Sequence, residues 1–461
     1  MPRRQLVAIV VSLALSGFVC SAALGAKFSR PVRLPGDIGG WSFVIAPDGE
    51  AMAVRDSERG ALIYPISRSM RLGPPVQLAV AGGYGLTLAD GALDDHGRIA
   101  LAFVYFDHTY EAPQEPHAGP SCCDRVAIAS WRLGEAPPEP QTLTPKLGSA
   151  AGIGHAPSWP QIVLGRQSVT ALWTLGAGEW EAGEGERLVP LKEAFGPFGG
   201  PYRTRTLMTA RHGIWDYVLT STPSGLPIAS WVDDGNKLHT VTGIANGALH
   251  RSLRSQALHG LIKEASYGFT TSAQGETLFA YQTSTHAGGN RLMTVASRDG
   301  TAFSRPRLIT TIPPRIARGQ VMLGPRGTLL AYSEHWTKET PTTESESIGR
   351  FAAGALSGPF GPSVRVSTFP GEPIGFVGGQ GEAVAIYRDY RHAQGFLLDA
   401  VIARAGHRFG RSHVLDPGLF GCGIEGNGET ELEPLETGPR GDAILLVTCE
   451  DNRQYAIRYT P

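Results

Sequence analysis

The chain has 461 residues, a formal charge of −1, and charged side chains at only 18% of its positions. This balance provides no broad basic surface, so we expect neither nucleic acid nor an anionic membrane as a partner. The 59 glycines and 34 prolines predict many turns, and the length allows one large β-rich domain.

The first 26 residues have the pattern of a secretory signal peptide. Residues 1–4 include two arginines, residues 6–19 are apolar, and residues 22–26 supply the small side chains that a signal peptidase requires. No later segment has the roughly 18 apolar residues of a membrane helix. We therefore expect residues 27–461 to form a single domain that is secreted, either extracellular or in the cell envelope.

Eight segments of the remaining chain alternate apolar and polar residues, and all but the third begin at a turn glycine. They are residues 49–54, 97–103, 168–173, 225–231, 275–281, 327–332, 381–387 and 441–447. Each is expected to be the second strand of a four-stranded unit about fifty residues long. Tandem units of this size predict an all-β fold, a β-propeller with eight blades. Seven blades are the alternative, because the fourth unit has a weak edge segment.

The two ends of the chain share one repeat. The edge segment Phe303-Ser304-Arg305-Pro306 recurs as Phe28-Ser29-Arg30-Pro31 at the start of the mature chain. Residues 294–297 form the strand that precedes residues 303–306, and their counterpart is residues 454–459 at the C-terminal end. We therefore expect the ring to be closed by pairing of the N-terminal and C-terminal strands.

One face of the ring is expected to carry the function. The connections from second to third strands lengthen at residues 107–121, 176–186, 283–290 and 334–346, whereas the turns between first and second strands stay short. Ligands of rigid scaffolds usually bind on such loop-bearing faces. A simple drift in loop length is the alternative.

Polar and aromatic residues cluster where second strands end on this face. The ligand-binding candidates are Asp107, His108, Glu334, His335, Trp336, Tyr387, Arg388, Asp389, Tyr390 and Arg391. Arginine and tyrosine beside carboxylates can bind a sugar acid or act in acid/base chemistry, and a solvated rim is the other interpretation. No catalytic residue is assigned.

Aromatic residues also recur just before or within the first strands, at Trp41, Tyr84, Trp159, Trp215 and Tyr267. Such side chains can face the channel mouth and stack on sugar rings. Packing between blades is the more common role of an aromatic residue at a repeated position.

Four cysteines remain after removal of the leader, and an even number in an exported chain suggests disulfides. We favour a bond between Cys422 and Cys449, which leaves the adjacent Cys122 and Cys123 as a vicinal pair. Reduced cysteines or another pairing are the alternatives. The spacing of His108 and His117 from these cysteines matches no zinc motif, so neither a metal nor a cofactor is expected.

Residues 297–303, Ser-Arg-Asp-Gly-Thr-Ala-Phe, resemble the Asp-box turn of the sialidase-like (BNR-repeat) β-propellers. That family normally has one residue between the acid and the glycine, whereas Asp299 and Gly300 are adjacent. The resemblance implies the repeat plan of a propeller. It does not extend to the sialidase catalytic set, because the chain has no aromatic-Arg-Ile-Pro motif: Arg315-Ile316 is followed by Ala317.

The sequence therefore predicts a secreted, monomeric, non-enzymatic propeller that recognises a glycan or an extracellular protein. The alternative is a sialidase-like glycoside hydrolase whose catalytic residues are unassigned.

Overall fold

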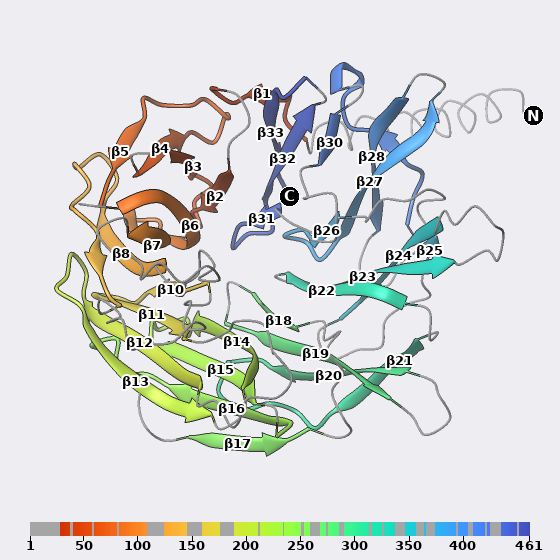
Figure 1. Cartoon of the computed structure of the whole chain (residues 1–461). Coiled ribbons are helices and arrows are strands. Elements are labelled where there is room, and N and C mark those ends of the chain that lie inside the picture. The colour runs from red at the N-terminus through yellow and green to blue at the C-terminus, as the bar shows by residue number, and fades with distance from the viewer. Residues whose placement is uncertain are drawn as a thin grey trace, which may run out of the picture.

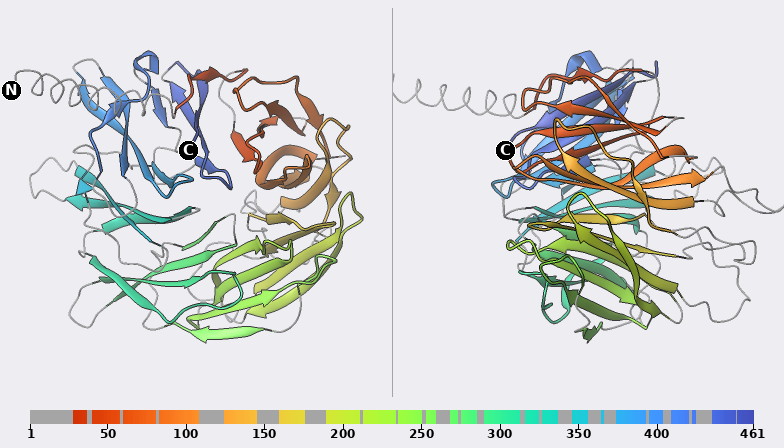
Figure 2. Two further views of the ribbon diagram at one scale, coloured as in Figure 1. Left: turned by 180° about the vertical axis from the view of Figure 1, so that it is seen from behind. Right: turned by 90° about the vertical axis from the view of Figure 1, so that its left-hand side faces the viewer.

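The computed structural model describes residues 28–36, 40–57, 60–80, 83–107, 124–144, 159–175, 189–210, 213–233, 235–249, 253–258, 268–272, 275–284, 290–312, 316–324, 327–336, 346–355, 364–365, 374–392, 395–403, 409–419, 422–424, 435–449 and 451–461. These residues form eight antiparallel sheets arranged around a ring, as Figures 1 and 2 show. The prediction of eight blades is confirmed, and the seven-bladed alternative is wrong.

Seven blades follow one strand order, from the centre of the ring to its rim. The innermost strands are β2 (Trp41–Ile45), β6 (Gly83–Leu93), β10 (Gln161–Leu164), β14 (Ile214–Ser221), β18 (Gly268–Thr271), β22 (Ile316–Gly324) and β26 (Ile374–Val377). The second strands are β3 (Ala51–Ser57), β7 (Arg98–Asp107), β11 (Ser168–Thr174), β15 (Pro227–Asp233), β19 (Thr277–Ser284), β23 (Gly327–Trp336) and β27 (Ala383–His392).

The third strands are β4 (Gly60–Ile66), β8 (Asp124–Arg132), β12 (Val189–Pro197), β16 (Lys237–Thr242), β20 (Asn290–Ser297), β24 (Glu346–Gly354) and β28 (Gly395–Ala403). The outer strands are β5 (Val76–Leu78), β9 (Gln141–Thr142), β13 (Arg203–Ala210), β17 (Arg254–Ala257), β21 (Arg307–Ile312), β25 (Val364–Arg365) and β29 (His413–Val414). A short 3-10 helix, η2 (Pro417–Leu419), follows the seventh blade.

The eighth blade joins the two ends of the chain. Its second and third strands are β32 (Ala443–Cys449) and β33 (Gln454–Tyr459), and the N-terminal β1 (Val32–Arg33) is its outer strand. Its innermost strand is in two pieces, β30 (Cys422–Ile424) and β31 (Leu435–Thr437), which pair with opposite ends of the same strand β32. The predicted Cys422–Cys449 disulfide joins β30 to β32. Cys122 and Cys123 lie outside the described residues.

The repeated Phe-Ser-Arg-Pro segment makes the same contacts at both of its sites. The Ser304 amide donates to the Ala296 carbonyl at 2.8 Å, and the Ala296 amide donates to Ser304 Oγ at 3.2 Å. The Ser29 amide donates to the Arg458 carbonyl at 2.7 Å, and the Arg458 amide donates to Ser29 Oγ at 3.0 Å. The shared sequence therefore reflects a shared structural role, and the predicted closure of the ring is confirmed.

The short turns between first and second strands depend on glycine at the positions that the pattern marked. Gly441 has a φ of +76°, and a Cβ there would lie 2.1 Å from the Gly379 backbone nitrogen of the preceding blade. An L side chain is disfavoured by both the left-handed conformation and this approach. Glycine therefore lets neighbouring blades come close at their turns.

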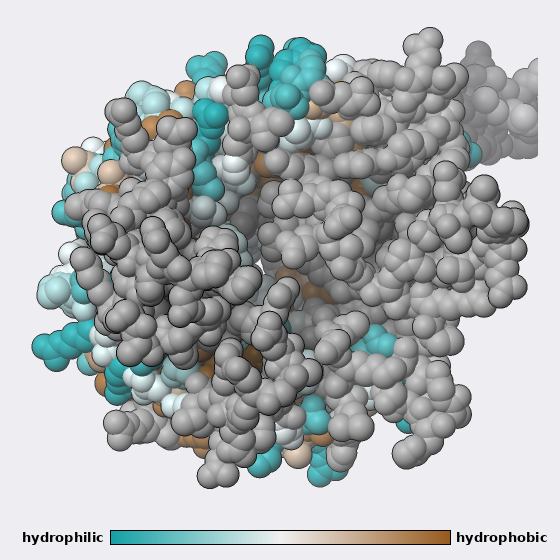
Figure 3. Space-filling model, viewed as in Figure 1, coloured by the Kyte–Doolittle hydropathy of each residue, from teal (hydrophilic) through white to brown (hydrophobic). Residues whose placement is uncertain are grey.

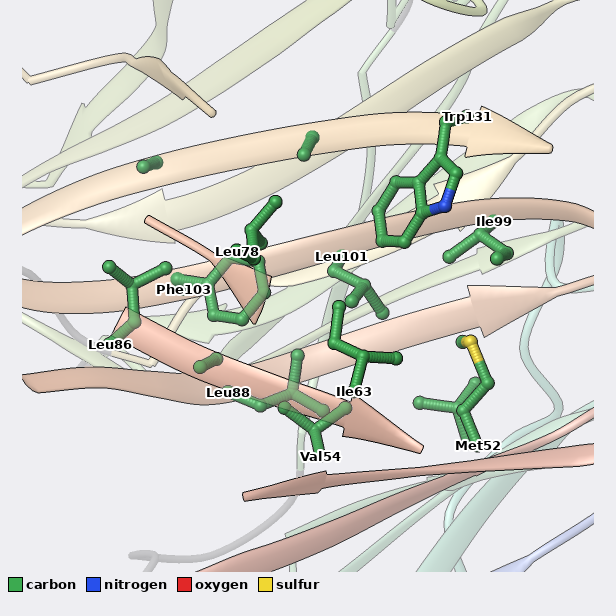
Figure 4. Close-up of a cluster of buried hydrophobic side chains, with 14 of the residues drawn as sticks. Met52, Val54, Ile63, Leu78, Leu86, Leu88, Ile99, Leu101, Phe103 and Trp131 are labelled. Atoms are coloured by element: carbon green, nitrogen blue, oxygen red, sulfur yellow. The ribbon is translucent and has the colours of Figure 1, made fainter. Parts of the chain in front are cut away.

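Each blade buries its two faces against its neighbours. In Figure 4, Met52, Val54 and Ile63 of the first blade face Leu88 and Phe103 of the second, and all five are at most 7% exposed. Apolar residues alternate along these strands, which places one set against each neighbour. Interfaces of this kind hold the innermost strands around the central axis, where they form the wall of a channel.

Candidate functional site

A cavity of about 530 Å³ lies on the axis of the ring. Its lining comes from the innermost strands of the second to the eighth blade and from the residues beside them: Ala89, Asp90, Trp159, Pro160, Gln161, Ile162, Val163, Val218, Leu219, Thr220, Ser221, Thr270, Thr271, Ser272, Met322, Leu323, Gly324, Val377, Thr437, Gly438 and Pro439. Figure 3 shows the hollow at the centre of the ring. A volume of this size is typical of a small-ligand site.

The wall of this cavity is joined from blade to blade by side chains that accept backbone amides. Asp90 Oδ2 accepts the Ile162 amide of the next blade at 2.6 Å, and Asp90 Oδ1 accepts the Gly91 amide at 2.8 Å. In the fourth blade, Asp216 Oδ2 accepts the Phe269 amide of the fifth blade at 2.7 Å, and Asp216 Oδ1 accepts the Tyr217 amide at 2.8 Å.

Neutral side chains make the equivalent contact at two other blade junctions. Gln161 Oε1 accepts the Leu219 amide at 2.6 Å, and Thr270 Oγ1 accepts the Leu323 amide at 3.0 Å. Four successive junctions, from the second blade to the sixth, are therefore closed by one polar side chain each. These contacts fix the innermost strands relative to one another and give the cavity a rigid wall.

Burial changes the acidity of the aspartates in these junctions. Desolvation raises the pKa of Asp90 to about 7 and that of Asp216 to about 6, although their amide hydrogen bonds act in the opposite direction. Asp56 links the first blade to Thr87 and Leu88 of the second, and desolvation raises its pKa to about 6 as well. These carboxyl groups therefore keep their protons to a higher pH than an exposed aspartate does.

Two tryptophans are exposed where innermost strands begin. Trp159 precedes β10, lines the cavity and is 60% exposed, whereas Trp215 lies in β14 and is 39% exposed. Trp215 is the extra residue of a β-bulge, since Ile214 pairs with Asp233 and Asp216 pairs with Val232. A bulge turns a side chain away from its regular direction. The Tyr217 hydroxyl donates to the Trp159 carbonyl at 2.5 Å and joins the two segments.

The other three aromatic residues predicted near the starts of first strands, Trp41, Tyr84 and Tyr267, are not shown to be exposed. Trp41 is 3% exposed and packs against Tyr64, with ring centroids 5.4 Å apart, so it serves the packing of the first blade. Tyr84 lies in β6, and its side chain is not among those described; Tyr267 lies outside the described residues. The structure therefore leaves Trp159 and Trp215 as the exposed aromatic residues of the set.

The ligand-binding candidates at the ends of second strands lie on the same face as Trp159 and Trp215. Asp107 pairs with Gly83 at the start of β6, and Glu334 pairs with Ile316 at the start of β22. We call this face, where innermost strands begin and second strands end, the loop face. His335 and Trp336 complete β23 there, and His108 lies outside the described residues.

The candidates of the seventh blade all belong to β27. Tyr387 is only 5% exposed and packs among apolar residues that include Val377 and Val401. Arg388, Asp389, Tyr390 and Arg391 follow it toward the loop face, and their side chains are not among those described. A ligand-binding role for these residues stays a prediction.

The inter-blade side chains Asp90, Gln161, Asp216 and Thr270 were not singled out from the sequence. An acidic residue within a strand that is expected to be apolar, such as Asp216 between Trp215 and Tyr217, could have indicated these contacts. In the described part of the chain, one cluster of three side chains could together hold a cation: Asp94, Asp95 and His96, in an exposed turn. Asp94 already bonds the Arg98 side chain and two backbone amides, so this turn has a structural explanation.

Among the described residues, no helix is long and apolar enough to cross a membrane.

No family model matches the sequence, and no curated protein does. Among solved structures, the chain is similar to a puromycin hydrolase mutant (17% identity, TM-score 0.39, 78% of this chain and 52% of that one). It is also similar to the BP39L lectin from Burkholderia pseudomallei (10%, TM-score 0.45, 82% and 99%) and to an α-L-arabinanase from Penicillium chrysogenum (12%, TM-score 0.34, 65% and 92%). The chain spans about half the length of the puromycin hydrolase. No function follows from likenesses this distant.

Proposed function

We propose that this propeller binds a neutral glycan in its central channel, with a sugar ring stacked on Trp159 and the end of the glycan in the central cavity. The observation that carries the proposal is the 60% exposure of Trp159 beside a cavity of about 530 Å³. An exposed indole on a rigid wall offers a flat apolar face, and sugar rings present matching faces of C–H groups. Trp215, which is 39% exposed near the start of β14, offers a second indole on the loop face.

The polar groups of the wall suit an uncharged ligand. Four of the lining residues, Thr220, Ser221, Thr271 and Ser272, carry hydroxyl groups, which can both donate and accept hydrogen bonds. Asp90 is the one charged residue among the described lining residues, which include no lysine or arginine. A sugar carboxylate would find no counter-charge there, so the described wall favours neutral sugars over sialic acid.

Hydrolysis at this site is the second candidate, and it requires two carboxyl groups, or a tyrosine and a carboxylate, facing one pocket. The described wall supplies one carboxyl group, Asp90, and both of its oxygens accept backbone amides. Recognition without cleavage is therefore the better-supported proposal for the channel. The signal-like N-terminus would place this recognition outside the cell.

A glycan panel tests the proposal. The purified mature protein, Trp159→Ala and Leu308→Ala are passed over immobilised neutral, sialylated and cell-wall glycans, and retention and product masses are recorded together. Leu308 is 54% exposed in the outer strand β21 and provides the matched control for loss of an exposed apolar side chain.

We expect retention on neutral glycans without new masses, about tenfold weaker for Trp159→Ala and unchanged for Leu308→Ala. Tenfold corresponds to about 1.4 kcal/mol. Equal retention of both variants would place the site elsewhere, and released sugars would favour the hydrolase.

A further inference from the structure

A serine, a histidine and an aspartate are aligned at the outer rim of the fourth blade, far from the cavity lining. His239 Nε2 lies 2.8 Å from Asp233 Oδ2, and His239 Nδ1 lies 2.8 Å from Ser255 Oγ. The three residues come from the adjacent strands β15, β16 and β17, which lie side by side in Figure 1, with β17 at the rim.

The hydrogen bonds define the protonation of the neutral imidazole. The Asp233 carboxylate can only accept, so His239 Nε2 carries the proton and donates it to Asp233. His239 Nδ1 is then an acceptor, and the Ser255 hydroxyl donates to it. This is the relation of nucleophile, general base and orienting acid that activates a serine, although the two ring nitrogens have exchanged their usual partners.

The surroundings hold the histidine and leave the serine accessible. His239 is 7% exposed and its ring stacks on Trp231, with centroids 5.2 Å apart and an interplanar angle of 18°. The stacked indole fixes the plane of the imidazole ring. Asp233 is oriented by the Lys237 amide, which donates to its Oδ1 at 2.9 Å. Ser255 is exposed to solvent.

The backbone of Ser255 adds an amide donor beside its own hydroxyl. The Leu258 amide donates to the Asn236 carbonyl at 2.9 Å, and the register continues without a shift to the pair His239 and Ser255. Hydrogen-bonded residues alternate along an antiparallel pair, so the Ser255 amide points away from β16. In the described part of the chain, no strand pairs with this outer edge of β17. The amide is therefore available to an oxyanion that forms on a bound carbonyl group.

We propose that Ser255, His239 and Asp233 form a hydrolytic site for short-chain carboxylic esters. Ser255 Oγ bonds to the ester carbonyl carbon while its proton passes to His239 Nδ1. The C–O bond to the alcohol then breaks, and the alcohol leaves with that proton. Water attacks the acyl-serine in the same way and releases the carboxylic acid. The sum is ester plus water giving acid plus alcohol.

The open position of the site indicates the class of ester. Ser255 lies on the edge of an outer strand, outside the described cavity lining, so the acyl group is short and need not be enclosed. The site is independent of glycan binding in the channel, because it shares none of the described lining residues.

The test is active-site labelling of the mature protein with a fluorophosphonate, together with hydrolysis of p-nitrophenyl acetate. The variants are Ser255→Ala, His239→Gln and, as a matched control, Ser224→Ala. Ser224 is an exposed serine of the same blade that bonds Thr222 rather than a histidine. Circular dichroism and melting curves establish that each variant is folded, and Asp233→Asn replaces His239→Gln if the latter unfolds.

We expect one label per chain, mapped to Ser255, and none on Ser255→Ala. His239→Gln should slow labelling and ester hydrolysis about 10²–10⁴-fold, the usual contribution of a general base, and Ser224→Ala should match the wild type. An unlabelled wild-type protein, or label that persists on folded Ser255→Ala, would overturn the proposal and leave the three residues as a brace between strands. Retention of glycans by Ser255→Ala tests the channel separately.

Discussion

Single carboxyl groups join the blades at the centre of this ring. Two opposing effects set the pKa of Asp90. Its two oxygens accept two backbone amides, which favours the charged form, while burial in the wall disfavours that form. Burial dominates, and the pKa of Asp90 rises from 3.8 to about 7. The folded protein therefore binds a proton at this position that the unfolded chain releases at lower pH.

The stability of the ring should depend on this group. Between the unfolded pKa near 3.8 and the folded pKa of about 7, the folded state holds more protons than the unfolded state, so the free energy of unfolding falls as pH rises through this window. Asp56 and Asp216 act in the same direction, with pKa values of about 6. Each unit of pKa difference corresponds to about 1.4 kcal/mol.

We expect the melting temperature of the wild type to be higher at pH 5 than at pH 8, and Asp90→Asn to reduce this difference. The amide is close in shape to the carboxyl group, keeps an acceptor for Ile162, and does not titrate. Melting curves at both pH values provide the measurement. An Asp90→Asn variant with the same dependence as the wild type would show that the titration lies elsewhere.

At the scale of elements, the N-terminal segment holds the ring closed. Val32 and Arg33 pair with Ala456 and Tyr455, and the Leu34 amide donates to the Gln454 carbonyl at 2.9 Å. Leu34 is 2% exposed. Phe28 packs edge-on against the ring of Tyr459, with centroids 5.2 Å apart. Full burial of Leu34 contributes about 1.5–3 kcal/mol, and the partly buried Phe28 adds to it.

Deletion of residues 27–34 should therefore lower the melting temperature by several degrees, because the outer strand of the eighth blade and its apolar contacts are lost. Differential scanning calorimetry of the shortened and the full mature protein measures this. As a milder comparison, Ser29→Ala removes only the hydroxyl that accepts the Arg458 amide and should cost far less. An unchanged melting curve for the deletion would contradict closure by the ends of the chain.

Strands were predictable because their signals are local. Turn glycines such as Gly97 and Gly441, followed by period-two alternation, gave the positions of β7 and β32 directly. The inner-wall contacts were not predictable in this way. Asp90 and Ile162 are 72 residues apart, and their contact depends on how two blades pack. The exposure of Trp215 depends on a bulge, which alternation in a single strand does not reveal.

At the scale of the whole molecule, eight sheets converge on one axis and the cavity belongs to none of them alone. Seven blades contribute to its wall, and four junctions among them are fixed by polar side chains that accept amides from the next blade. Such a wall needs little rearrangement when a ligand enters, which reduces the entropic cost of binding. Trp159 then presents its indole in a fixed position.

Hydroxyl-radical footprinting of the mature protein can show whether a neutral glycan covers Trp159. Oxidation of each tryptophan and of Leu308 is measured by peptide mass spectrometry, with and without a glycan that the panel has shown to be retained. We expect bound glycan to protect Trp159 strongly and Trp215 to a smaller extent, and to leave Leu308 unchanged. Equal oxidation of Trp159 in the free and the glycan-saturated protein would contradict this expectation.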